Sequence, residues 1–80
     1  MLEALETRNK VVGLKQLKKA LREGTAATVF VAKDADPRVT EPIYTACREG
    51  NIPLEECESM SRLGKACGIE VGAAVAAVLR

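Results

Sequence analysis

Several residue types that enzymes and zinc proteins commonly use are missing from this chain. It has no histidine and no tryptophan, and its aromatic residues are Phe30 and Tyr44 alone. Without histidine, neither a Ser–His nor a Cys–His nucleophilic pair can be built, and zinc loses its usual nitrogen ligand. With so few aromatic residues the core must be aliphatic. These absences argue against a hydrolase built on such a pair and against a zinc protein.

Motifs that hold nucleotide phosphates are absent as well, since the chain contains neither GxGxxG nor GxxxxGK[ST]. Acids cluster at residues 34–36 and 55–58, and a pair of carboxylates can perform acid–base catalysis. However, Asp36 stands directly before Pro37, which is typical of a helix cap, and the glutamates are typical of a solvated strand end. We therefore expect no enzyme, no cofactor and no metal site.

Paired cysteines and long apolar runs are also missing. Cys47, Cys57 and Cys67 form no CxxC motif, and an odd number with apolar neighbours is typical of reduced, buried thiols in a cytosolic protein. No apolar run approaches the ~20 residues that cross a bilayer. The first ten residues are too short and too acidic for a secretory signal. We expect a cytoplasmic protein that makes no membrane contact.

The basic residues are unevenly distributed along the chain. The net charge is only +1, yet residues 1–33 hold seven of the twelve basic residues and three of the eleven acids. Such asymmetry indicates a local basic surface on an otherwise balanced protein. Eighty residues that are 48% apolar suffice for one small domain, residues 1–80.

Hydrophobic periodicity predicts helices that alternate with strands. Helices are expected over residues 2–7, 14–23, 36–50 and 60–67, and strands over residues 11–12, 28–32, 52–57 and 73–79. Pro42 should disturb the third helix, so either its first turn is irregular or the helix starts near Thr40. The alternation predicts an α/β fold, a three-layer α/β/α sandwich with a small four-stranded mixed sheet.

The second predicted helix follows Gly13 and carries a cationic stripe, Lys15, Lys18, Lys19 and Arg22. A glycine at its front leaves the first backbone N–H groups open to an anion, which the helix dipole favours. The alternative is a solvated basic face that only maintains solubility. Loops at one end of an α/β sheet gather at one edge, so residues 13–19, 33–37, 58–61 and 69–72 should lie together.

That combination of cations, a carboxylate and aliphatic side chains suits RNA with unstacked bases. The lack of aromatic residues argues against a flat stacking platform.

Four sequence stretches, in order and at matching separations, resemble one protein superfamily. They are VGLKQ at residues 12–16, AKDADP at 32–37, LGKACG at 63–68 and IEVGAA at 69–74. They resemble the superfamily of the archaeal ribosomal protein "L-seven-Ae" and the eukaryotic "L-thirty-e", and above all its short bacterial ribosomal-protein-like members, over about residues 9–79. The resemblance implies an α/β/α sandwich that binds kink-turn RNA, a bent duplex with a bulge beside tandem sheared G·A pairs.

The resemblance also implies an RNA-binding site. Gly13 would approach the RNA backbone, and the side chains that follow it would read the G·A pairs or their phosphates. Asp36 would accept hydrogen bonds from guanine, and the loop at residues 69–72 would pack on the extruded bulge nucleotide. Met60 stands where other members often carry lysine. The expected RNA-binding residues are Gly13, Lys15, Gln16, Lys19, Lys33, Asp36, Met60, Ile69, Glu70, Val71 and Gly72.

We thus expect a monomeric, cytoplasmic bacterial protein that stabilises kink-turn RNA in the ribosome or in a riboswitch. The alternative is a protein-interaction adaptor on the same fold without RNA binding, which needs an exposed apolar patch of more than about a few hundred Å². For single residues the alternatives are that Gln16 is an ordinary helix residue, that Asp36 is purely a cap, and that Ile69 and Val71 belong to the core.

Overall fold

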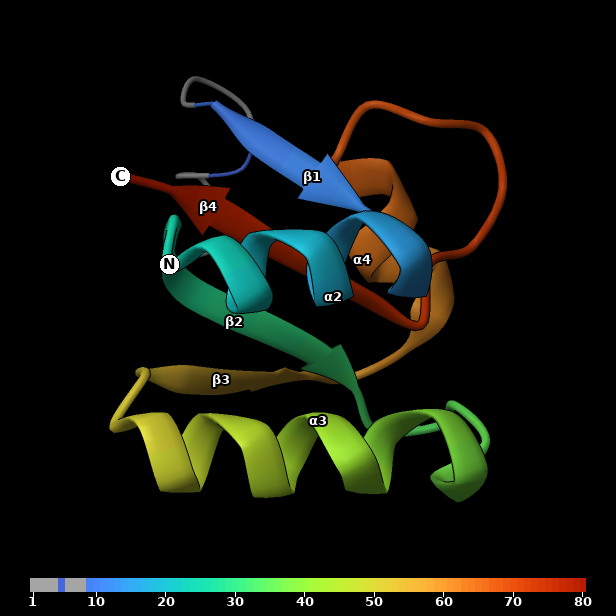
Figure 1. Cartoon of the computed structure of the whole chain (residues 1–80). Coiled ribbons are helices and arrows are strands. Elements are labelled where there is room, and N and C mark those ends of the chain that lie inside the picture. The colour runs from blue at the N-terminus through green and yellow to red at the C-terminus, as the bar shows by residue number, and fades with distance from the viewer. Residues whose placement is uncertain (1–4, 6–8) are drawn as a thin grey trace.

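The computed structural model describes residue 5 and residues 9–80. In this part of the chain a four-stranded mixed sheet lies between helices (Figure 1). The elements are β1 (Lys10–Val12), α2 (Leu14–Glu23), β2 (Ala26–Ala32), α3 (Pro37–Gly50), β3 (Leu54–Cys57), α4 (Met60–Ala66) and β4 (Val75–Leu79). The strand order is β1-β4-β2-β3, in which β4 runs antiparallel to both neighbours and β2 runs parallel to β3. The predicted α/β sandwich with a small mixed sheet is confirmed.

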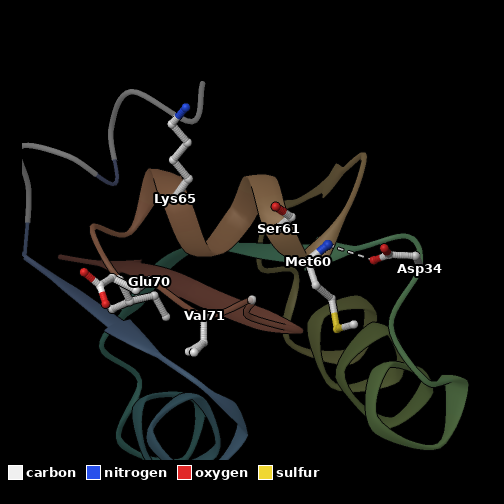
Figure 2. Close-up of a pocket in the computed structure, with 8 residues that line it drawn as sticks. Asp34, Met60, Ser61, Lys65, Glu70 and Val71 are labelled. Carbon is white, nitrogen blue, oxygen red and sulfur yellow. Dashed lines mark hydrogen bonds between the residues drawn. The ribbon is translucent and has the colours of Figure 1, made fainter.

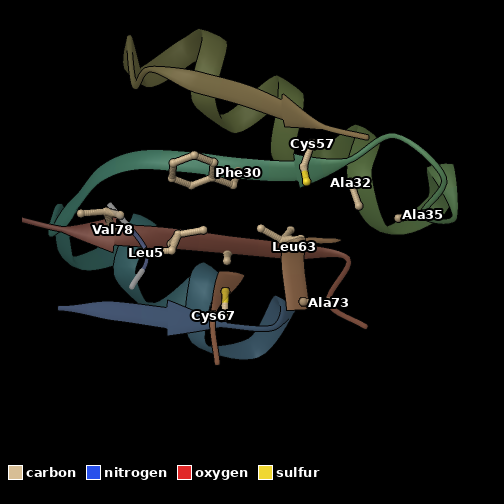
Figure 3. Close-up of a cluster of buried hydrophobic side chains, with 10 residues drawn as sticks. Leu5, Phe30, Ala32, Ala35, Cys57, Leu63, Cys67, Ala73 and Val78 are labelled. Carbon is tan, nitrogen blue, oxygen red and sulfur yellow. The ribbon is translucent and has the colours of Figure 1, made fainter. Parts of the chain in front are cut away.

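Two aliphatic clusters pack on opposite faces of the sheet, because successive residues of a strand point to opposite sides. On one face Phe30 of β2 lies with Leu63 of α4 (Figure 3). On the other face Val29 of β2 lies with Leu17 of α2 and Ile43 of α3. The central strands β2 and β4 are therefore covered on both sides, as their continuous apolar runs predict.

The three cysteines are free and buried, as predicted. Burial raises the pKa of the Cys47 and Cys67 thiols, which keeps them protonated and unreactive near neutral pH. Leu5 is helical, and its side chain is fully buried in the same cluster as Phe30 and Leu63. The rest of the helix predicted for residues 2–7 lies outside the described residues.

The helix ends follow their sequence signals. Asp36 caps α3, because its carboxylate accepts the backbone N–H of Arg38 at 2.9 Å. Ser59 caps α4 by accepting the N–H of Arg62 at 3.1 Å. Gly24 ends α2 in the left-handed conformation that glycine adopts without strain.

The expectation that Pro42 disturbs α3 is wrong. The helix runs unbroken from Pro37 to Gly50. Pro42 removes the donor that would bond the carbonyl of Arg38, and both residues are exposed, so water can satisfy that carbonyl. The strands β3 and β4 each begin two residues later than predicted, at Leu54 and Val75.

The strand directions bring four loops to one edge of the sheet. The strands β1, β2 and β3 end at this edge, and β4 begins there. Figure 1 shows the first turn of α2, the start of α3 and the orange loop before β4 on this side, at the right of the view. The predicted gathering of loops is confirmed, and we call this side of the protein the loop edge. Within the described residues no helix is long and apolar enough to cross a membrane.

Tyr44, the single tyrosine of the chain, gives a test of the contact between α3 and β3. Its hydroxyl donates to Oε2 of Glu56 at 2.6 Å, and this bond, with some desolvation, raises the pKa of Tyr44 to about 12. Because the bond needs a protonated phenol, its contribution to stability is fully present below the ordinary pKa of about 10 and is lost as the pH rises through about 12.

We expect the ultraviolet absorbance of the phenolate to appear at lower pH in Glu56→Ala, in which the acceptor and its charge are gone. Glu55→Ala is the matched control, because adjacent strand residues point to opposite faces, and its titration should match the unmodified protein. An unchanged titration in Glu56→Ala would contradict the contact.

Candidate functional site

The N-terminal end of α2 is open to an approaching ligand. Gly13 precedes the helix with φ +94° and ψ 160°, a backbone conformation that side chains rarely adopt. Its N–H donates to the carbonyl of Val75 at 3.0 Å, which fixes the helix start beside β4. Within the part of the chain that the structure describes, no side chain caps the helix, so its first N–H groups and the positive end of its dipole remain available to an anion.

The exposed face of α2 is cationic. Lys15 and Lys19 are four residues apart and share the outer face of the helix, next to Gln16. Gln16 and Lys19 also line a small groove of about 180 Å³ beside β1. Among residues 9–80 the ion pairs join Arg38 to Asp36 and Arg62 to Glu58, so none involves α2.

A larger pocket of about 610 Å³ lies beside the loop that follows α4, residues 69–72, which we call the pocket loop (Figure 2). Its lining combines charged and apolar side chains: Asp34, Met60, Ser61, Lys65, Ile69, Glu70, Val71 and Gly72. Val71 is 71% exposed and Ile69 is 37% exposed, so the alternative that they belong to the core is wrong. An aliphatic surface with a charged rim can receive a flat organic group such as an unstacked base.

Two glycines let the pocket loop lie close against α4. A Cβ atom at Gly72 would stand 3.1 Å from Cβ of Met60, and one at Gly64 would overlap the carbonyl oxygen of Val71. The N–H of Ala73 donates to the carbonyl of Met60 at 3.0 Å. The loop is therefore held by backbone contacts, which leaves the side chain of Val71 free to face a ligand.

Of the two acids Asp34 and Asp36, Asp34 lines this pocket. Asp36 does not line it, since its oxygens accept the Arg38 guanidinium at 2.8 to 3.3 Å and the Arg38 backbone N–H. This side-chain contact lowers the pKa of Asp36. Asp34 lines the pocket instead, and its Oδ1 accepts the N–H of Met60 at 2.8 Å.

Sequence reasoning missed Asp34, Ser61 and Lys65 as lining residues. The residues Asp34 and Met60 stand 26 positions apart, and no local pattern signals a bond over that separation. The spacing of Ser61 and Lys65, four positions apart on the predicted helix, was the available signal that they share one face.

Nine of the eleven expected residues fall into two groups, one on α2 and one at the pocket. Gly13 and Lys15 lie at the start of α2, with Gln16 and Lys19 continuing along the helix. The other group lines the pocket: Met60, Ile69, Glu70, Val71 and Gly72. Lys33 is exposed where β2 ends, and its N–H donates to the carbonyl of Cys57. Asp36 lies in the segment between β2 and α3. It caps the start of α3, and its carboxylate points to Arg38.

The close packing at Gly64 gives a second prediction. A methyl group there would meet the backbone of Val71 and Gly72, which cannot rotate away as a side chain can. We expect Gly64→Ala to displace the pocket loop and to lower the free energy of unfolding by about 1–3 kcal/mol, although alanine is the better helix former. Chemical denaturation measures the loss.

The matched control is Gly50→Ala, since a Cβ at Gly50 would meet only the side chain of Ile52, at 3.4 Å. This control should not lose stability. A Gly64→Ala protein as stable as the unmodified one would contradict the packing.

The chain is similar to a known protein family and to named relatives. A model of the ribosomal protein L7Ae/L30e/S12e/Gadd45 family matches residues 1–80. An RNA-binding protein of Geobacillus sp. (strain WCH70) is 46% identical over 78 residues, which are 98% of this chain and 95% of that protein. The RNA-binding protein YbxF of Geobacillus stearothermophilus is 50% identical over 70 residues, 88% of this chain and 85% of that protein.

The fold has a solved counterpart. The structure of a 15.5 kD RNA-binding protein of Giardia lamblia superposes with a TM-score of 0.88 at 26% identity, over 99% of this chain and 70% of the other. The names of these relatives describe binding proteins and no enzyme, in line with the expected lack of catalysis. By the family model and by these relatives, the chain belongs to the ribosomal protein L7Ae/L30e/S12e/Gadd45 family.

Proposed function

We propose that this protein is a non-catalytic RNA-binding protein that recognises and stabilises kink-turn RNA, in the ribosome or in a riboswitch. One observation carries the proposal: the open N-terminal end of a cationic helix and an exposed aliphatic loop over a pocket lie at the same edge of the sheet. The relatives named as RNA-binding proteins, at 46% and 50% identity, support an RNA partner.

In this mechanism α2 enters the major groove where the kink widens it. A Cβ at Gly13 would meet no other part of the protein within 4 Å. Because glycine has no Cβ, this space is left to the RNA, which can come close to the backbone. Lys15 and Lys19 neutralise phosphates and release their counterions, or donate to guanine. Gln16 has the donor and acceptor pair that matches the adenine edge of a G·A pair.

The pocket loop receives the nucleotide that the kink extrudes. Ile69 and Val71 supply an apolar surface for its base, and Lys65 supplies a cation at the pocket rim. Burying the base offsets part of the cost of unstacking it, because aliphatic and base surfaces leave water together. The protein then shifts RNA toward the bent state by the difference between its affinities for the bent and extended states.

An adaptor that binds proteins is less well supported. Among residues 9–80 the exposed large hydrophobic residues are Ile69 and Val71, which belong to one loop with Glu70 between them. Two such side chains form a smaller patch than protein interfaces use.

The discriminating experiment compares two RNAs. Energy-transfer and gel-shift titrations should show tight binding and bending of an RNA that carries tandem sheared G·A pairs beside a bulge. Converting these pairs to Watson–Crick pairs should weaken binding by about tenfold to a hundredfold, since each lost base contact costs about 1–3 kcal/mol. Equal affinity for both RNAs would refute the mechanism.

Substitutions on α2 separate phosphate contacts from base contacts. Lys19→Ala should weaken binding to all RNAs alike and lower the salt slope by about one, because one phosphate contact is lost. Gln16→Ala should cost about 1–3 kcal/mol and reduce discrimination between the two RNAs. Arg48→Ala removes a cation from the last turn of α3, at the other end of the sheet, and should change neither property. If Arg48→Ala weakened binding and lowered the salt slope as much as Lys19→Ala does, the binding would be non-specific charge attraction.

A further inference from the structure

One hydrogen bond at the loop edge joins two distant parts of the chain. Met60 is the first residue of α4, so its N–H has no acceptor within the helix. It donates to Oδ1 of Asp34 at 2.8 Å, across the gap between the loop after β2 and the start of α4 (Figure 2). The capping residue Ser59 does not serve this donor, since its hydroxyl accepts from Arg62. Asp34 thus fixes the first turn of α4 from outside the helix.

Met60 in turn holds the pocket loop. Its carbonyl accepts the N–H of Ala73 at 3.0 Å, directly after the loop, and its Cβ lies against Gly72. The helix α4 has only seven residues and is packed on the sheet by the buried Leu63, and the bond to its first turn fixes the end that lies beside the pocket loop. Asp34, Met60 and Ala73 form a continuous link from the end of β2 to the pocket loop.

We propose that Asp34 is a positioning residue for RNA recognition: through Met60 it holds the pocket loop in the conformation that receives the extruded nucleotide. This inference rests on the proposed function. A loop that is already in place loses less conformational entropy on binding, so the link raises affinity without any contact between Asp34 and RNA.

Because Asp34 also lines the pocket, its action through Met60 must be separated from a direct contact with the base. Asparagine makes this separation, since its carbonyl oxygen can still accept the N–H of Met60 while the charge is lost. Alanine removes the acceptor entirely. Glu58→Ala is the control for charge, because it removes an exposed carboxylate near α4 whose ion pair is with Arg62, at 3.9 Å.

The test measures binding to a kink-turn RNA and to the same RNA with an abasic nucleotide at the extruded position. Relative to Asp34→Asn, which loses the same charge, Asp34→Ala should weaken binding to the first RNA by about tenfold and leave binding to the abasic RNA unchanged, because the pocket then has no base to hold. Asp34→Asn should change both affinities by one common factor, as Glu58→Ala does, because it loses the charge and keeps the acceptor. Glu58→Ala should change both affinities by the same factor, since the loss of a charge does not depend on the base.

Three results would overturn the proposal. If Asp34→Ala weakened binding to both RNAs equally, Asp34 would have a general structural role. A loss in Asp34→Asn as large as that in Asp34→Ala would mean a direct contact between the carboxylate and the base. Unchanged binding in Asp34→Ala would leave the link with no role in recognition.

Amide hydrogen exchange tests the link itself without RNA. Asp34→Ala should speed exchange at Met60 and Ala73 by about tenfold, while the amides of β2 and β4 keep their rates. Unchanged exchange at Ala73 would overturn the idea that Asp34 acts through Met60. If the unmodified protein bound neither RNA, the proposed function and the RNA role of Asp34 would fall together, and the exchange rates would still decide whether Asp34 holds the loop.

Discussion

Backbone hydrogen bonds hold the start of β4 from both sides, and the candidate site depends on this constraint. Gly13 donates to the carbonyl of Val75 at 3.0 Å, and Ala32 donates to the carbonyl of Ala74 at 2.9 Å. The first bond places the open end of α2 beside the segment that leads into β4, and the second places the end of β2 there. The pocket loop immediately precedes this segment, so a sheet of four short strands is enough to bring helix end and loop together.

The site combines two kinds of physical interaction that respond differently to conditions. The cations of α2 act through charge, so their contribution to binding falls as salt rises and is largely independent of sequence. The pocket loop acts through shape and apolar contact, because Val71 and Ile69 are exposed on a backbone that Gly64 and Gly72 hold close to α4. On this account affinity comes mainly from the helix and selectivity for an extruded nucleotide comes from the loop.

Most of the fold could be predicted from the sequence, because its signals are local. Asp36 before Pro37 predicts a cap, and the apolar run into Ala32 predicts a central strand. Two features could not be predicted. Pro42 is tolerated in α3 because it lies with Arg38, whose carbonyl loses its donor, on an exposed part of the helix that water can reach. Asp34 bonds Met60, a partner that only the folded sheet brings near, so the sequence showed no sign of this contact.

The most direct test of the central claim, that the end of α2 and the pocket loop form one RNA surface, is an NMR titration with kink-turn RNA. The account predicts that the backbone amides of Gly13, Lys15 and residues 69–72 shift together, at one stoichiometric point, while those at the last turn of α3 stay in place. Shifts confined to α2, or shifts concentrated at the last turn of α3 around Arg48, would contradict it.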